Sequence, residues 1–269
     1  MLQVGDTRFA IRCNYSSFTK WLIEKHGDFL TDDEPHLRLN IRLVRVRQGQ
    51  NSGVFRSIVV NRDCHEHGEL GLSVVCSHPA YFFWPMLQIC LRCAINKKQP
   101  PDLLVHSSGI VKGGMAYLFL GPSGLGKSTI CKLLGPEPTF TILHDDMVAV
   151  TQTDNGFHAW STPLSGEMPA QFSSGAPIRV AFFLQHDRTN YATKLSRRKA
   201  VGLVMRNLVP PLTVTNVGLG INSTESLRLL LKLAEHIPCY ELHFRPERDF
   251  WECIERLFSE DYAAALGKG

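Results

Sequence analysis

The chain has 269 residues, of which 44% are hydrophobic and 20% are charged. That composition is too apolar for a disordered chain, and the length allows one large domain or two small ones with a substantial core. The sequence has no run of about 18 uncharged apolar residues, and its start lacks the pattern of a signal peptide, so we expect a cytoplasmic protein with no membrane partner. The formal net charge of +4 is too small to indicate a nucleic-acid partner by itself.

The first hundred residues have mostly the texture of strands and turns. Helices are expected at 16–25 and 80–95, and strands at 36–47, 57–60 and 70–75. In the first of these strands one face carries Leu37, Leu39, Ile41 and Leu43, and the phase then reverses, which predicts a β-bulge before Val44. We therefore predict a small α+β module over residues 1–100, ended by the polar link at 96–102, where Pro100 and Pro101 force extended backbone.

The order changes after this link to strand, glycine-rich loop, helix and strand. Strands are expected at 116–120, 140–144, 147–151 and 239–244, and helices at 127–134, 223–236 and 247–257, the last one opened by Pro246. Residues 263–269 are expected to fray. The strand at 116–120 is fully apolar, which is typical of a strand buried on both faces of an α/β sheet. We predict one α/β core over residues 101–269.

Several clusters of reactive residue types favour a structural explanation. The eight cysteines are irregularly spaced in apolar stretches, which indicates reduced, buried thiols. The run from Cys64 to His67 has metal-ligating residue types but no second cluster at zinc spacing, so a polar hairpin turn is the stronger interpretation. Cys90 and Cys93 lie in an apolar helix and are expected in the core. The basic run from Arg197 to Lys199 favours a solvated loop over a contact with an acidic substrate.

The strongest functional signal is the glycine-rich loop, a Walker A motif. It has the form G-x-x-x-x-G-K-[ST] and consists of Gly121, Pro122, Ser123, Gly124, Leu125, Gly126, Lys127 and Ser128, followed by Thr129. Glycines let successive backbone N–H groups converge on a polyphosphate, and the positive end of the following helix points at the same phosphates. Lys127 adds a charge for the β- and γ-phosphates, and the Ser128 hydroxyl can ligate Mg²⁺. The motif therefore predicts a nucleotide triphosphate, with ATP and Mg²⁺ as the expected cofactors.

Two adjacent carboxylates follow the next predicted strand. Asp145 and Asp146 lie eighteen and nineteen residues after Lys127. In isolation such a pair favours an acidic β-turn, but beside a phosphate-binding loop it indicates function. One carboxylate can hold Mg²⁺, and its neighbour can accept the proton of an attacking hydroxyl.

The combination of these motifs resembles the HPr kinase/phosphorylase group, which shares its core with phosphoenolpyruvate carboxykinase. Beyond the loop and the aspartate pair, the resemblance is carried by His106 within residues 104–109, by the run from Thr162 to Glu167, and by Phe244-Arg245-Pro246. It covers roughly residues 103 to the last helix and implies an HPr kinase C-terminal-like core with a mixed β-sheet and flanking helices. Residues 1–96 do not contribute to it.

The resemblance also implies roles for individual residues. Lys127 and Ser128 match the phosphate-binding lysine and the metal-binding serine, and Asp146 matches the base that deprotonates a target serine, with Asp145 as its partner. His106 matches an active-site histidine that positions the nucleophile. A short local likeness makes Glu167 a second Mg²⁺-linked residue and Arg245 a residue that stabilises the transferred phosphate. Without the resemblance, His106 would be explained as a structural hydrogen-bonder, Glu167 as a solvated acid and Arg245 as an ion-pair partner.

The sequence also departs from the family. Thr129 replaces the glutamate that usually follows the loop serine, and Met168 and Pro169 begin a stretch without the glycine-rich signature expected after Glu167. These departures argue against HPr itself as the acceptor and against the reverse, phosphorolytic reaction. The resemblance implies a serine kinase that acts on a protein or peptide. A small-molecule kinase and a nucleotide-sensing module without catalysis remain alternatives, and the residues do not specify whether the chain forms the homo-oligomer known for HPr kinases.

Overall fold

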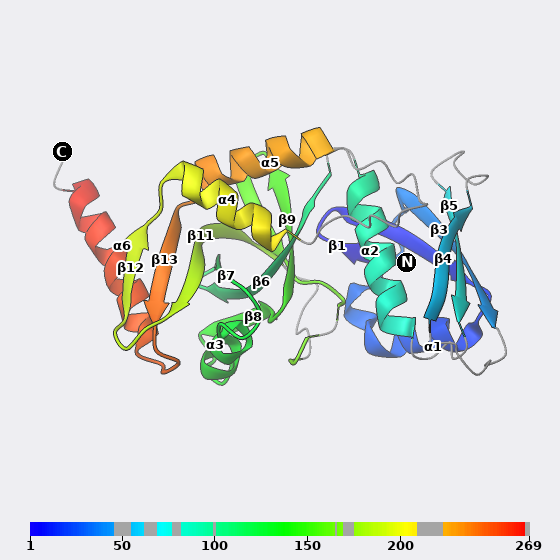
Figure 1. The fold of residues 1–269 in the computed structure, drawn as a ribbon, viewed down its shortest axis with the longest axis horizontal. Helices are drawn as coiled ribbons and strands as arrows, with labels where there is room; N and C mark the ends of the chain where they lie inside the picture. Colours follow the sequence, from blue (N-terminus) through cyan, green and yellow to red (C-terminus); the bar gives the residue numbers. More distant parts are fainter. Residues whose placement is uncertain are drawn as a thin grey trace.

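The structure is a computed structural model, which describes residues 1–45, 55–61, 69–76, 82–98, 101–164, 166–168, 175–208 and 223–266. The part of the chain before residue 98 contains a mixed five-stranded sheet, ordered β1-β2-β3-β5-β4 (Figure 1). Its strands are β1 (Leu2–Val4), β2 (Thr7–Cys13), β3 (Leu37–Arg45), β4 (Phe55–Asn61) and β5 (Glu69–Cys76). The helical elements are α1 (Ser16–Lys25), the short 3₁₀ turn η1 (Gly27–Phe29) and α2 (Phe83–Lys97).

The alternating pattern in the third strand predicted its buried face correctly. Leu37, Leu39, Ile41 and Leu43 are all buried in one core with α1 and α2. The predicted β-bulge is wrong, because β3 pairs with β5 without a register shift from Arg38 to Arg45. At the expected position Leu43 and Val44 lie opposite Val74 and Val75 of β5, residue for residue, so this part of the ladder is regular.

An eight-stranded sheet forms the larger part of the described structure, in the order β10-β9-β6-β7-β11-β13-β12, with β8 paired to β6. Its strands are β6 (Leu103–Lys112), β7 (Met115–Leu120), β8 (Phe140–His144), β9 (Met147–Thr153), β10 (Gly156–Trp160), β11 (Gly175–His186), β12 (Tyr191–Lys194) and β13 (Cys239–Phe244). Its helices are α3 (Lys127–Leu134), α4 (Arg197–Asn207), α5 (Ser223–His236) and α6 (Phe250–Leu266). The protein is thus a mixed α/β structure with helices flanking its sheets, as the sequence predicted.

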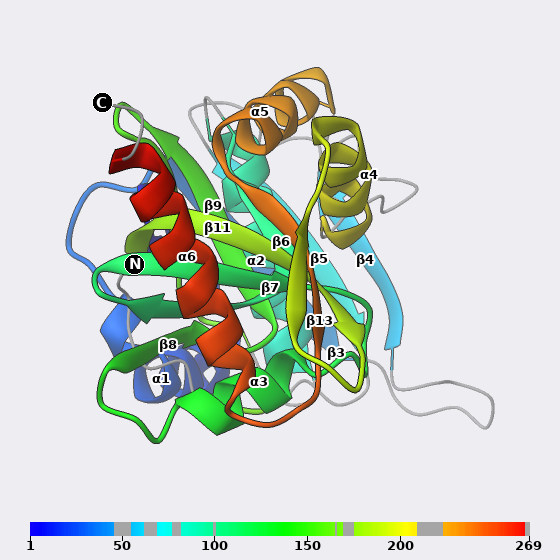
Figure 2. The same ribbon diagram turned by 90° about the vertical axis from the view of Figure 1, so that its left-hand side faces the viewer.

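The two faces of the larger sheet bury alternate residues of the same strands. On one face Phe119, Phe182 and Leu242 pack under α3 and α6. On the other face Leu118, Phe183 and their neighbours pack under α4 and α5. Figures 1 and 2 show α4 and α5 side by side on one side of this sheet and α3 on the other. Because every central strand is covered on both faces, the continuous apolar run at 116–120 is explained.

The two sheets share apolar and polar contacts. Leu104 and Ala149, from β6 and β9, belong to the same core cluster as the five-stranded sheet. The Thr7 hydroxyl donates a hydrogen bond of 2.6 Å to the buried carboxylate of Asp102. The division at residue 100 stays a prediction, and in this structure the parts on either side of it pack against each other.

Three other predicted boundaries differ from the structure. The last helix begins at Phe250 and not at Glu247, because Pro246 leads into tight turns in which Phe250 and Trp251 donate to carbonyls three residues back. That helix continues to Leu266, through residues expected to fray. The basic run that starts at Arg197 forms the first turn of α4 rather than a loop.

Candidate functional site

Several strands of the larger sheet end at the same edge. β7, β11 and β13 are parallel, and β8 runs in the same direction because both β7 and β8 are antiparallel to β6. Ser107 of β6 lies opposite Leu120, the last residue of β7, so His106 lies just beyond it at this edge. The register of β6 and β9 pairs His106 with Met147. The turn of Asp145 and Asp146, which precedes Met147 and which we call the acidic turn, therefore lies beside His106. Sheet pairing therefore gathers the predicted residues.

The loop from Gly121 to Gly126 connects β7 to α3. Gly121, Gly124 and Gly126 have φ angles of 155°, 86° and 91°, a region that L side chains rarely adopt. A Cβ on Gly126 would also lie only 3.0 Å from the ring of Phe244, so the glycine allows a close approach. Sequence and geometry agree at this point, because the loop turns sharply and α3 begins at Lys127.

Lys127 lies largely buried under this loop. Its Nζ donates hydrogen bonds to the carbonyl oxygens of Gly121 at 2.8 Å and Pro122 at 3.2 Å. Burial lowers the pKa of Lys127, while the nearby negative charge of Asp146 acts in the opposite direction. A desolvated ammonium group held by carbonyl oxygens gains more from a bound anion than a solvated one.

Asn207, the last residue of α4, fastens the start of the loop. Its Oδ1 accepts a hydrogen bond of 3.1 Å from the Gly121 amide, and its Nδ2 donates one of 2.8 Å to the carbonyl of Leu203. The side chain is buried. No local sequence pattern indicates this contact, because it joins residues 86 positions apart in the chain.

Asp146 and His106 form the second part of the site. The His106 Nε2 lies 2.6 Å from Asp146 Oδ1, and about a third of each side chain is exposed. This hydrogen bond is the main cause that lowers the pKa of Asp146, against the opposing effect of burial. The carboxylate is therefore ionised at neutral pH and held in a fixed direction.

His144 supports the acidic turn from below. Its Nδ1 accepts hydrogen bonds from the backbone amides of Asp146 at 2.9 Å and Met147 at 3.0 Å. Its Nε2 lies 2.9 Å from the carbonyl oxygen of Leu164 and donates to it, since Nδ1 is the acceptor. Burial lowers the pKa of His144, so the neutral ring ties the turn to the described residues 162–164 through Leu164. No local pattern in the sequence indicates this role of His144.

Asp145 points into a tight space beside Gly166 and Glu167. It is only 1% exposed, and its Oδ2 accepts a hydrogen bond of 2.9 Å from the Glu167 amide. Its Oδ1 is buried and has no hydrogen-bond partner among the described residues. A buried carboxylate oxygen without a donor is suited to a cation, and the Ser128 side chain lines the same cavity. These residues fit the Mg²⁺ that the loop motif implies.

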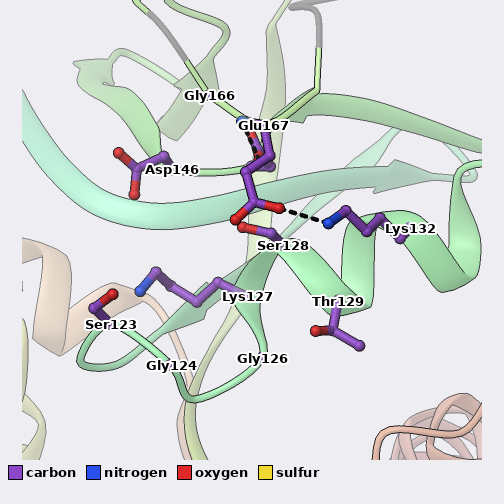
Figure 3. Close-up of a pocket in the computed structure, with 11 residues that line it drawn as sticks. Ser123, Gly124, Gly126, Lys127, Ser128, Thr129, Lys132, Asp146, Gly166 and Glu167 are labelled. Atoms are coloured by element: carbon purple, nitrogen blue, oxygen red, sulfur yellow. Dashed lines mark hydrogen bonds and ion pairs between the residues drawn. The ribbon is translucent and has the colours of Figure 1, made fainter.

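A cavity of about 540 Å³ connects these groups (Figure 3). It is lined by Ser123, Gly124, Gly126, Lys127, Ser128, Thr129, Lys132, Asp145, Asp146, Gly166 and Glu167. In Figure 3 the loop and α3 form one side, and Asp146 and Glu167 come from the other. The structure thus brings together the predicted loop residues and the three predicted carboxylates, and His106 joins them through Asp146.

The remaining predicted residues lie elsewhere or are engaged differently. Glu167 forms an ion pair of 2.5 Å with Lys132, a cavity residue that the sequence analysis did not identify. Arg245 does not line the cavity and forms ion pairs with Asp249 and Glu247. The carbonyl oxygen of Pro122 accepts a hydrogen bond from Lys127, and Leu125 packs against the apolar core under α3.

The described residues contain neither a larger metal-binding cluster nor a membrane-spanning helix. No group of three or more His, Cys, Asp or Glu side chains suited to a metal ion occurs among them, and the run from Cys64 to His67 lies outside the described ranges. None of the described helices is both long and apolar enough to cross a membrane.

Comparison with known proteins gives a family match and a structural similarity. The model of the family described as SynChlorMet cassette protein ScmC matches residues 81–259, from just before α2 into α6. The chain is also similar to the structure of the Hpr(Ser) kinase/phosphatase from Coxiella burnetii, with 12% sequence identity and a TM-score of 0.34. That similarity covers 61% of this chain and 93% of the other. No curated protein sequence matches the chain.

Proposed function

The chain belongs to the family of SynChlorMet cassette proteins ScmC, and we propose that it is an ATP- and Mg²⁺-dependent phosphotransferase that acts on a serine hydroxyl of a protein or peptide. One observation carries the proposal: the ionised Asp146, held by His106, faces a glycine-rich loop and its buried lysine across a single cavity. The resemblance of the motifs to HPr kinase/phosphorylase supports the same reaction class.

The phosphate-binding part of the proposal rests on the loop. Positive-φ glycines free the backbone amides to converge on phosphate oxygens, and α3 directs its N-terminal end into the cavity. Lys127 would exchange its two loop carbonyls for phosphate oxygens. Mg²⁺, held by Asp145 and Ser128, would neutralise charge on the phosphates.

The proton-accepting part of the proposal rests on Asp146. Phosphoryl transfer needs positioning and charge neutralisation more than a strong base, so a carboxylate with a lowered pKa is suited to orient a hydroxyl and take its proton as the bond forms. His106 donates to Oδ1, which leaves Oδ2 for the acceptor hydroxyl. His144 fixes the backbone that carries this carboxylate.

Nucleotide binding tests the first step. We expect titration calorimetry with MgATP to show binding to the wild-type protein and an affinity lower by at least about tenfold for Lys127→Ala, because one buried charge-assisted contact is lost. Lys25→Ala, at an exposed lysine on α1, is the matched control and should bind as the wild type does. Equal affinities of all three proteins would contradict the proposal.

A further inference from the structure

The two helices on one face of the larger sheet concentrate the positive charge of the protein. α4 and α5 together contain six basic and two acidic residues, namely Arg197, Arg198, Lys199, Arg206, Arg228 and Lys232 against Glu225 and Glu235. Their net charge of +4 equals the formal net charge of all 269 residues. The rest of the chain is neutral in sum, so these two helices account for the net positive charge of the sequence.

Most of this charge is not neutralised within the molecule. Arg197 pairs with Glu235 at 2.9 Å, which joins the first turn of α4 to the last turn of α5. In the described part of the chain, the other five basic residues of these helices have no ion-pair partner, and all five are exposed. By contrast, Lys112 pairs with Glu255 and Arg248 with Glu137. We call these five basic residues and the helix surface between them the α4–α5 face.

Apolar side chains lie among these charges. Met205 on α4 is 50% exposed, and Leu227 and Leu231 on α5 are 43% and 38% exposed. The two leucines are four residues apart and share one side of α5, with Arg228 and Lys232 next to them in the chain. A partner that covers this surface must supply both carboxylates and apolar groups. A nucleic acid would match the charge and leave the apolar groups without contacts.

The α4–α5 face begins at the candidate active site. Asn207, which ends α4, binds the Gly121 amide at the start of the loop. The next residue, Leu208, forms a β-bridge with Val105, which precedes His106. An eleven-residue helix is about 16 Å long, so a chain lying along α4 has one end beside the cavity and the other near Arg197. Figures 1 and 2 show α5 next to α4 on the same side of the sheet.

We propose that the α4–α5 face is the docking surface for an acidic segment with apolar side chains in the phosphoacceptor chain. The identification of the partner as the acceptor rests on the proposed function, whereas the docking surface rests on charge, exposure and position. Docking of this kind accounts for substrate selection outside the cavity, because carboxylates steer the partner to the five basic residues and leucine-type side chains cover Met205, Leu227 and Leu231.

Fluorescence anisotropy with a labelled synthetic peptide tests the docking surface. The peptide has about 15 residues and contains serine, glutamate and leucine. We expect it to bind the full-length protein, more weakly as the salt concentration rises, and to bind the triple variant Arg198→Glu, Arg206→Glu, Arg228→Glu at least about tenfold more weakly. The control variant Arg12→Glu, Lys25→Glu, Arg42→Glu changes the net charge equally at exposed sites in the first hundred residues and should bind as the wild type does.

Three results would overturn the docking proposal. These are equal losses of affinity in the two triple variants, equal binding of a peptide with lysine in place of glutamate, and tighter binding of a DNA duplex or of phosphatidylserine vesicles than of the acidic peptide. Circular dichroism and thermal unfolding establish that the variants fold. If the triple variant does not fold, Arg206→Gln with Leu231→Ser replaces it, with the same expected direction.

Phosphate transfer separates this inference from the proposed function. If the peptide binds through the α4–α5 face but no acceptor ever receives phosphate, the docking surface stands and the phosphotransferase proposal fails. If both triple variants phosphorylate the acidic peptide with the same KM, the phosphotransferase proposal stands and the docking surface fails.

Discussion

Gly166 offers a sharp test of how the acidic turn is held. A Cβ at this position would lie 1.8 Å from Oδ1 of Asp145 and 2.9 Å from its Cγ, whereas real Cβ atoms essentially never approach another heavy atom closer than 3.0 Å. The obstructing carboxylate is 1% exposed and cannot turn into solvent. In Gly166→Ala, the carboxylate or the backbone of Gly166 and Glu167 must therefore move by about 1 Å.

The magnitude follows from the contacts that such a movement breaks. The Glu167 amide loses its hydrogen bond to Asp145, which leaves a buried carboxylate without a donor at a cost of about 1–3 kcal/mol. Overpacking adds about 1–3 kcal/mol. The two costs are not fully additive, because the movement that breaks the hydrogen bond also relieves the overpacking. We expect Gly166→Ala to lower the free energy of unfolding by about 2–4 kcal/mol, and the affinity for MgATP by at least about tenfold.

Urea denaturation and MgATP titration measure these two effects. Gly202→Ala is the control, because Gly202 lies exposed in α4 with nothing within 4 Å of an added Cβ. In a helix this change should raise the free energy of unfolding by about 0.5–1 kcal/mol and leave nucleotide binding unchanged. The reasoning is refuted if Gly166→Ala is as stable as the wild type and binds MgATP equally well.

Three further predictions concern other parts of the structure. Asn207→Leu removes the acceptor of the Gly121 amide and should weaken MgATP binding by about tenfold. Asn207→Asp keeps an acceptor oxygen and should restore part of the affinity. Unchanged affinity of Asn207→Leu by calorimetry would show that the contact is dispensable. Burial lowers the pKa of His26 to about 4, so between pH 6.5 and 4 only the unfolded chain takes up this proton. As the pH is lowered through that window, the free energy of unfolding should therefore fall by roughly 2 kcal/mol. Urea titrations at several pH values should show a smaller fall for His26→Leu. Lys132→Ala frees the carboxylate of Glu167 and should lower the Mg²⁺ concentration needed for half-maximal ATP binding; no change would count against Glu167 as a metal-linked residue.

Local chemistry explains which features could be predicted from the sequence. The loop from Gly121 to Ser128 needs glycines for its own backbone geometry, so its motif is visible without any tertiary contact. The buried face of β3 follows from the alternation of apolar residues along the strand, and the burial of β7 on both faces follows from its continuous apolar run. The position of Asp146 at the cavity followed from its place at the end of a strand.

Long-range contacts explain what the sequence did not disclose. Asn207 binds a residue 86 positions away, and His144 supports the acidic turn through Leu164, so neither role leaves a local pattern. The ion pairs of Arg245 with Asp249 and Glu247 compete with the phosphate-stabilising role that a short likeness implied. The start of the last helix was misplaced because Pro246 is equally suited to a tight turn and to a helix N-terminus.

Transfer of labelled γ-phosphate tests the central claim most directly, namely that Asp146 accepts a proton from a hydroxyl beside a bound triphosphate. Wild-type protein and Asp146→Asn are incubated with γ-labelled ATP, Mg²⁺ and the proteins of a lysate from the same source, after calorimetry has established that both bind ATP equally. We predict label on a serine of an acceptor with the wild-type protein and at least about a hundredfold less with the variant. Equal transfer by the two proteins, or no transfer by the wild type, would contradict the account.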